Sequence, residues 1–238
     1  MTIAENVAAV RANMARAALA AGREPGEILL LAATKMNDAG RIREAIAAGV
    51  DLCGENRVQE MLEKQAQGAY VGVPLHFIGH LQKNKVKQVV GQVALIHGVD
   101  SLPLLETVSR VAEGRGLCQD VLLEINIGAE ESKSGFAPEE LSAALARAGE
   151  LPGVRVRGLM AIPPICGAPE ENRPFFLRMQ QLFIDNKEKK YDNVSMDFLS
   201  MGMSGDYTEA IACGANLIRV GSSIFGPRPY AAPTSPSA

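Results

Sequence analysis

The sequence predicts an α/β protein folded as a single (β/α)8 TIM barrel, and three observations lead to this prediction. Short apolar segments alternate with amphipathic helical segments along most of the chain, the pattern of parallel strands joined by helical crossovers. Eight such apolar segments can be read, and a closed eight-stranded barrel accommodates them without exposing a sheet edge. The length of 238 residues is common for one such barrel. An open, doubly wound sheet is the main alternative.

The first predicted element is a helix within residues 1–22 that packs on the barrel. Thr2 and Glu5 fit a capping box at its start, because a threonine N-cap is followed three residues later by a glutamate. Apolar residues then recur at helical spacing and form one stripe, at Ile3, Val7, Val10 and Met14.

Strands and helices are then predicted to alternate. The strands are expected at 28–34, 51–55, 75–79, 94–98, 121–126, 156–162, 194–200 and 216–221. The second is the weakest prediction, because it is short and contains Gly54. Helical patterns occupy 39–49, 56–67, 102–116, 137–150, 171–190 and 205–214, and the charged run 82–88 is interpreted as a solvated helix face. Residues 1–228 are therefore predicted to form one domain, and the Pro-, Ala- and Ser-rich tail 229–238 is expected to be disordered.

Composition and charge argue against several functional classes. The net charge of −3 argues against a nucleic-acid binder, which usually presents a basic face. No apolar run reaches the roughly 18 residues of a membrane span, and charged residues interrupt any signal-peptide core near the N-terminus. The four cysteines are too widely spaced for a zinc or redox motif. The chain is expected to be cytoplasmic, without a metal, and to bind neither nucleic acid nor membrane.

Two loops suited to an anion follow the last two predicted strands, where barrels often bind phosphate. The segment "SMGMSGD" (200–206) follows the seventh strand, and "GSSIFG" (221–226) follows the eighth. Glycines let backbone N–H groups approach an anion, and a helix start adds a positive dipole. Either loop alone reads as an ordinary helix cap, but two on adjacent strands predict a phosphate cup.

Lys35 ends the first apolar strand, and Arg219 lies within the eighth. Because these strands are neighbours in a closed barrel, Lys35 is expected to stand beside Arg219 and above the phosphate cup. A lysine desolvated beside another cation has a lowered pKa and becomes a nucleophile towards carbonyl groups. A lysine that reaches into solvent and an arginine in a structural ion pair are the alternative interpretations.

Lysine, arginine and a phosphate cup together favour pyridoxal 5′-phosphate held as a Schiff base, with arginine at the pyridine nitrogen. Because arginine keeps its proton, the ring nitrogen would stay largely unprotonated, which weakens the cofactor as an electron sink.

Six motifs in order resemble the pyridoxal phosphate homeostasis protein family and span nearly the whole folded chain. They are "TKM" (34–36), "GENRVQEM" (54–61), "LHFIGHLQKNK" (75–85), "ESKSGF" (131–136), "SMGMSGDYTEAI" (200–211) and "IRVGSSIFGPR" (218–228). The resemblance implies the fold-type III barrel shared with the N-terminal domain of alanine racemase, without the β domain of that enzyme. It also implies bound pyridoxal phosphate and a non-catalytic role as carrier or regulator in intracellular vitamin B6 homeostasis.

The resemblance also implies roles for individual residues. Lys35 matches the Schiff-base lysine, and Arg219 matches the arginine at the pyridine nitrogen. Phosphate contacts are implied at Ser200, Ser204, Gly221 and Ser222. The mouth of the site would be lined by Asn56 and His80, with Met160 near the ring, although His80 reads equally well as a capping or core histidine.

Other positions are less direct. Lys133, in "ESKSGF", suggests a mobile lysine that accepts the cofactor during transfer, or a solvated lysine. The chain departs from the family where "MNDAG" follows Lys35 without the usual proline, and where Leu75 replaces a frequent tryptophan. These changes affect packing around the first and third strands, and not the inferred ligand groups.

Two enzymatic alternatives stay open. An amino-acid racemase would need a second base opposite Lys35. In alanine racemases that base is a tyrosine from a second domain, for which this chain has no residues left after the eighth strand, and Tyr207 is the only plausible substitute. A sugar-phosphate isomerase would need an acid–base group such as Glu124 or His80. For the carrier, the expected partners are pyridoxal-phosphate-dependent apo-enzymes or B6-pathway enzymes, and the expected state is a monomer or weak dimer.

Overall fold

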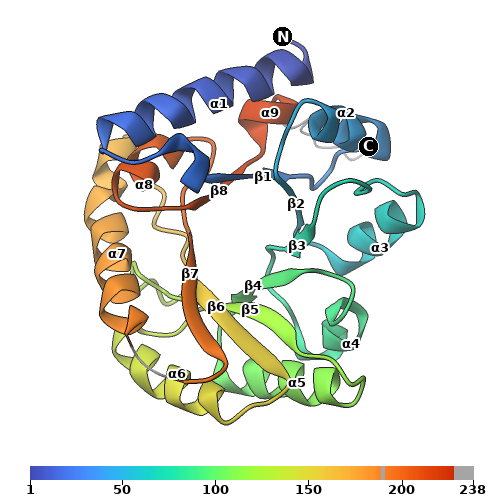
Figure 1. Ribbon diagram of the computed structural model, residues 1–238, viewed down its shortest axis with the longest axis vertical. Coiled ribbons are helices and arrows are strands. Elements are labelled where there is room, and N and C mark those ends of the chain that lie inside the picture. Colours follow the sequence, from blue (N-terminus) through green and yellow to red (C-terminus); the bar gives the residue numbers. More distant parts are fainter. Residues whose placement is uncertain (189–190, 228–238) are drawn as a thin grey trace, which may run out of the picture.

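The structure is a computed structural model that describes residues 1–188 and 191–227. Eight parallel strands close into a barrel in chain order, with helices around the outside (Figure 1). The strands are β1 (Leu29–Ala33), β2 (Leu52–Glu55), β3 (Leu75–Phe77), β4 (Leu95–Val99), β5 (Gln119–Glu124), β6 (Val154–Met160), β7 (Val194–Ser200) and β8 (Leu217–Val220). The barrel closes where β8 pairs with β1, with Leu31 opposite Arg219. The predicted barrel is confirmed, including its short second strand, and the open sheet is excluded.

Helices follow the strands in the predicted alternation. They are α1 (Ile3–Ala20), α2 (Ala39–Ala47), α3 (Val58–Ala66), α4 (Val86–Val89), α5 (Leu102–Glu113), α6 (Leu141–Gly149), α7 (Arg173–Lys187), α8 (Tyr207–Ala212) and α9 (Ser222–Phe225). Short 3-10 turns are η1 (Pro25–Glu27), η2 (Lys83–Lys85), η3 (Pro138–Glu140) and η4 (Pro169–Asn172). Proline opens three of these turns, where its missing N–H costs little, and α6 and α7 therefore begin later than expected. The charged run 82–88 divides between η2 and α4, which buries Val86 and Val89.

Helix α1 covers the side of the barrel where β8 meets β1. The predicted capping box is present, because the Thr2 hydroxyl accepts from the Glu5 N–H at 3.2 Å and the Glu5 carboxylate accepts from the Thr2 N–H at 2.8 Å. The predicted stripe is buried, together with Ala18. The helix packs against α8, α9 and α2. It therefore connects the last helices of the barrel with the first one (Figure 1).

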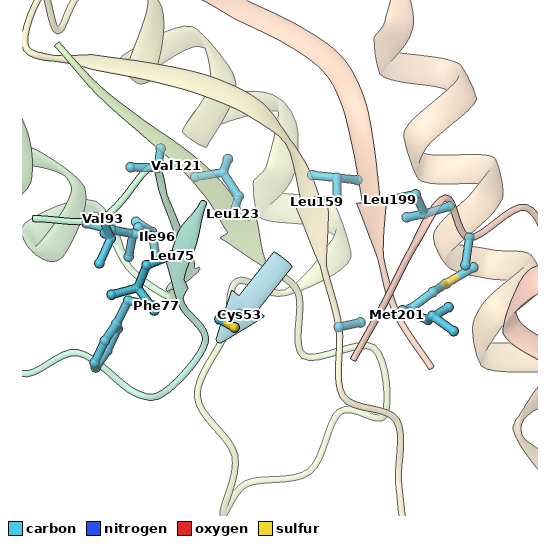
Figure 2. Close-up of a cluster of buried hydrophobic side chains, with 14 of the residues drawn as sticks. Cys53, Leu75, Phe77, Val93, Ile96, Val121, Leu123, Leu159, Leu199 and Met201 are labelled. Carbon is cyan, nitrogen blue, oxygen red and sulfur yellow. The ribbon is translucent and has the colours of Figure 1, made fainter. Parts of the chain in front are cut away.

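Strand residues alternate between two apolar layers. Leu30, Ala32, Cys53 and Phe77 belong to the large layer between the strands and the surrounding helices, and Figure 2 shows part of this layer, with Cys53 and Phe77 among its labelled residues. Leu31 and the other residues of opposite parity form smaller clusters inside the barrel: Leu52, Leu217, Leu95, Leu122 and Met160. This alternation decides which side chains continue from the barrel interior into the mouth.

Some sequence predictions concern features outside the barrel itself. The tail 229–238 lies outside the described residues, and one domain over 1–228 stays a prediction. Within residues 1–188 and 191–227, no helix is both long enough and apolar enough to cross a membrane. The cysteines are free thiols: Cys53 and Cys213 are buried, Cys166 is partly buried and Cys118 is exposed.

Candidate cofactor site at the mouth of the barrel

Strand alternation brings polar side chains together beyond the carboxyl ends of the strands. Leu31 and Leu217 point into the barrel, and every second residue along a strand shares that direction. Lys35 continues this parity past the end of β1, and Arg219 continues it within β8. The register of β1 with β8 places these two chain segments side by side. The predicted proximity of Lys35 and Arg219 is therefore found, and both line one pocket.

One cavity at this end, here called the mouth pocket, has a volume of about 370 Å³. Five of the predicted site residues line it: Lys35, Asn56, His80, Met160 and Arg219. The other lining residues are Ala33, Ile78, Gly79, Glu124, Ile125, Asn126, Lys133, Ser134, Ile162 and Met203. The barrel thus collects residues that are far apart in sequence into one polar-rimmed, apolar-walled site.

A second cavity of about 280 Å³, here called the cup pocket, adjoins the mouth pocket. Gly221 and Ser222, two predicted phosphate contacts, line it with Met36, Asn37, Arg41, Phe225, Gly226 and Pro227. Ala33 and Lys35 line both cavities. Lys35 therefore stands between the predicted ring site and the predicted phosphate site.

Arg219 is 5% exposed and is held by neighbouring backbone. One guanidinium nitrogen donates to the Ser200 carbonyl at 2.8 Å and to the Ser200 hydroxyl at 2.6 Å, and the other donates to the Ala161 carbonyl at 3.0 Å. Burial lowers the pKa of Arg219 to about 10, while the nearby Glu124 carboxylate opposes this effect. Arg219 therefore stays protonated at neutral pH and presents a fixed cation to the mouth pocket.

The Ser200 side chain does not lie where the expected phosphate contact would place it. Ser200 is fully buried inside the barrel, and it lines neither cavity. Its hydroxyl contacts His97 at 3.1 Å as well as Arg219, and His97 contacts His76 at 3.0 Å. The reason is depth along the barrel: Ser200 points into the barrel interior at the end of β7, below the loop that was expected to bind an anion. We therefore revise Ser200 to a support for Arg219.

The remaining cup residues form a hydrogen-bonded turn. The Ser204 hydroxyl accepts from the Gly221 N–H at 3.1 Å and from the Ser223 N–H at 3.4 Å. Ser204 is not itself a lining residue, but it bridges the loops after β7 and β8. Both backbone N–H groups are thus directed at Ser204, and the Arg41 guanidinium supplies positive charge on the wall of the cup pocket.

Three further predicted residues line the mouth pocket. The Asn56 side-chain oxygen is buried without a hydrogen-bond partner, which is unusual for a polar atom and suits a ligand in the mouth pocket. His80 is exposed and its Nδ1 lies 3.0 Å from the Asp100 carboxylate, so it is neither a core residue nor a helix cap. Met160 is 1% exposed and forms part of the apolar pocket floor.

Lys133 reaches the same mouth from the loop after β5. Its ammonium donates to the Pro163 carbonyl at 3.0 Å and pairs with Glu130 at 2.7 Å. It lines the mouth pocket and also an adjoining groove formed around residues 162–169. Its side chain is 30% exposed, so Lys133 is partly buried between these two spaces.

Sequence reasoning missed Arg41 and Asn37 and gave Glu124 only an isomerase role. Arg41 donates to the Asn37 side chain at 3.0 Å and also contacts the Phe225 carbonyl, which holds it against the cup pocket. Burial, with a smaller contribution from the nearby Asp100, raises the pKa of Glu124 to about 7. The inward parity of "LLE" in β5 was a usable signal for Glu124, whereas nothing in "DAGRI" distinguishes Arg41 from a solvated helix residue.

Known proteins resemble this chain over almost its full length. The family described as "Alanine racemase, N-terminal domain" matches residues 6–229. A Pseudomonas aeruginosa relative named "Pyridoxal phosphate homeostasis protein" is 42% identical over 234 residues, which is 98% of this chain and 99% of the relative. A relative of the same name from Aquifex aeolicus is 41% identical over 97% of this chain and all of the relative.

Solved structures agree with the sequence relatives. PipY of Synechococcus elongatus, solved with pyridoxal phosphate bound, is 34% identical, with a TM-score of 0.81 over 94% of this chain and all of PipY. Alanine racemase of Clostridium difficile is 16% identical, with a TM-score of 0.68 over 95% of this chain and 57% of the enzyme, and shows the shared fold alone. This chain therefore belongs to the pyridoxal phosphate homeostasis protein family.

Proposed function

We propose that this protein binds pyridoxal 5′-phosphate as a Schiff base with Lys35 and acts as a carrier or regulator in intracellular vitamin B6 homeostasis, without catalytic turnover. The observation that carries the proposal is the place of Lys35 between two adjoining cavities. One cavity presents the buried Arg219, and the other presents Gly221, Ser222 and Arg41. The relatives named for this role and the pyridoxal-phosphate-bound PipY support it independently.

The residues present fit this cofactor. When bound, pyridoxal phosphate supplies an aldehyde that can condense with an amine, a phosphate and a pyridine nitrogen. Lys35 supplies the amine, Arg41 supplies positive charge in the cup pocket lined by Gly221 and Ser222, and Arg219 supplies a proton donor that does not give up its proton. The unpartnered oxygen of Asn56 supplies an acceptor towards the same space.

A second candidate function is amino-acid racemisation, which Glu124 favours because its pKa near 7 suits proton transfer in the mouth pocket. Against it, the expected substitute base Tyr207 is buried and accepts from Asn13 on α1 at 3.0 Å. No tyrosine lines either cavity among the described residues. The sugar-phosphate isomerase is not proposed, because the relatives are of another family.

The first test is the visible absorption spectrum of the purified protein, before and after borohydride, followed by mass mapping of the labelled peptide. The expected result is a yellow protein whose chromophore is trapped on Lys35, and a Lys35→Ala variant without that adduct. Lys83→Ala is the matched control, since Lys83 is an exposed lysine away from both cavities. A protein that stays colourless with added cofactor would contradict the proposal.

Two assays then separate carrier from enzyme. In the first, the holo-protein is mixed with a pyridoxal-phosphate-dependent apo-enzyme, and recovery of the enzyme's activity measures transfer. In the second, L-alanine is incubated with the protein and loss of optical rotation is followed. Transfer without racemisation is expected. Racemisation that disappears in Glu124→Gln would favour the second candidate. Size-exclusion chromatography in parallel tests the proposed monomer or weak dimer.

A further inference from the structure

The backbone on both sides of Lys35 is held by two side chains of helix α3. The carbonyl of Thr34, just before Lys35, accepts from the Lys64 ammonium at 2.9 Å. The N–H of Met36, just after Lys35, donates to the Glu60 carboxylate at 2.5 Å. Lys64 and Glu60 are themselves paired at 2.6 Å. One ion pair therefore contacts the chain immediately before and immediately after Lys35.

The ion pair belongs to a buried network that is not part of either cavity. Lys64 is only 7% exposed, and it also pairs at 2.7 Å with Glu55, which is fully buried. The same Glu55 oxygen accepts from the Thr34 hydroxyl at 2.6 Å and from the Tyr70 hydroxyl at 3.1 Å. Burying a lysine and a glutamate costs desolvation free energy, which their pairing only partly offsets. Two apolar residues would therefore stabilise a strand end as well as this ion pair does.

The turn at Lys35 has a conformation that requires such support. Met36 has φ of 62°, in the left-handed region, which is strained for a residue with a side chain. The Met36 side chain is 56% exposed, so apolar packing contributes little to holding it. The hydrogen bond from its N–H to Glu60 opposes relaxation of this turn, together with the Asn37 side chain, which donates to the Lys35 carbonyl at 3.0 Å.

We infer that Lys64 and Glu60 are positioning residues that direct the Lys35 amine to the boundary between the mouth pocket and the cup pocket. The inference rests on the proposed attachment of pyridoxal phosphate to Lys35. Thr34 and Met36 set the direction of the Lys35 side chain, and α3 holds both of them from outside the two cavities. Small displacements of a reacting group lower rates strongly, so loss of this support should slow attachment.

The test measures the rate of imine absorbance after apo-protein is mixed with pyridoxal phosphate, and the share of borohydride-trapped label on Lys35. Glu60→Ala removes the acceptor for the Met36 N–H, and Lys64→Met removes the cation. Each is expected to slow attachment about 10- to 100-fold and to spread label to other lysines. Glu60→Gln keeps an acceptor oxygen and is expected to recover most of the rate.

Arg157→Met is the matched control, because Arg157 also pairs with two carboxylates, Asp120 and Asp197, each at 2.6 Å. It lies on β6 outside both cavities, so its loss should leave attachment unchanged. If Lys64→Met does not fold, the comparison of attachment rates between Glu60→Ala and Glu60→Gln tests the inference. Wild-type rates and labelling in Glu60→Ala would overturn the inference. Absence of a Lys35 adduct in the wild type would instead overturn the proposed function.

Discussion

One guanidinium nitrogen of Arg219 donates to both the carbonyl and the hydroxyl of Ser200, at 2.8 and 2.6 Å. The two residues lie on adjacent strands, and the Ser200 hydroxyl continues through His97 to His76 in the barrel interior. The arginine that faces the mouth pocket is thus oriented from below by a buried polar chain. Such chains hold a charged group firmly only while every member keeps its partners.

The first prediction concerns this contact. Ser200→Ala removes a buried acceptor from Arg219 and is expected to destabilise the protein by about 1–3 kcal/mol, measured by urea denaturation. Pyridoxal phosphate should also dissociate faster, because Arg219 is less firmly oriented. Ser195→Ala, on the same strand but with its hydroxyl on Asp197, is the control and should change neither quantity appreciably. Equal dissociation rates for wild type and Ser200→Ala would contradict the assignment.

The second prediction concerns acid stability. Burial lowers the pKa of His76 to about 4, and burial also holds the pKa of His97 well below its usual value. A histidine whose pKa is depressed on folding contributes stability above its unfolded value near 6.5, and this is lost as the pH falls towards 4. Unfolding free energy should therefore fall across this window in wild type and less steeply in His76→Gln/His97→Gln. Urea titrations at several pH values measure this free energy. Equal pH dependence of the unfolding free energy in wild type and the double variant would contradict the prediction.

The third prediction concerns Glu124, whose contribution to stability falls, and does not rise, as the pH increases. Burial and Asp100 raise the pKa of Glu124 from 4.5 to about 7. A carboxyl whose pKa is raised on folding contributes stability below its unfolded value, and this contribution is lost as the pH rises towards 7. Glu124→Gln should therefore gain stability relative to wild type as the pH is raised from 4.5 to 8. Thermal midpoints of both proteins at matched pH check this, and a constant difference would contradict it.

The fourth prediction concerns Gly79, which lines the mouth pocket after β3. A Cβ at this position would meet the Asn56 carbonyl oxygen at 2.2 Å and the Asn56 Cα at 2.6 Å, and backbone cannot move aside easily. Gly79→Ala is expected to lower stability by about 1–3 kcal/mol and to weaken cofactor binding through displacement of Asn56. Gly26→Ala, where a Cβ meets nothing within 4 Å, is the control. Equal binding constants in a spectroscopic titration would count against this reading.

The sequence allows the barrel and most of its mouth to be predicted, because both follow from local alternation. The apolar runs ending at Lys35 and containing Arg219 are neighbours in any closed eight-stranded barrel, so their proximity follows from strand order. Asn56 and His80 follow in the same way from the ends of β2 and β3.

Contacts that depend on three-dimensional register could not be predicted. Ser200 and Ser204 lie in one sequence motif. Ser200 is the last residue of β7 and supports Arg219 inside the barrel, whereas Ser204 lies in the loop above it and contacts Gly221. Lys64 occupies an amphipathic helix where lysine is usually solvated, yet it folds inward onto Glu55. Pairing across distant elements, and not local pattern, determines these roles.

The fifth prediction concerns Lys133, which lines the mouth pocket with Lys35. Because Lys133 also lines the adjoining groove, it is placed to accept the cofactor on its way out of the mouth. Lys133→Ala should leave borohydride trapping on Lys35 intact while slowing reactivation of an apo-enzyme about tenfold, as expected when a positioned amine is removed. Lys87→Ala, an exposed lysine on α4, is the control and should transfer at the wild-type rate. Unchanged transfer by Lys133→Ala would leave this lysine with only its contacts to Glu130 and Pro163, a role in ordering the loop after β5.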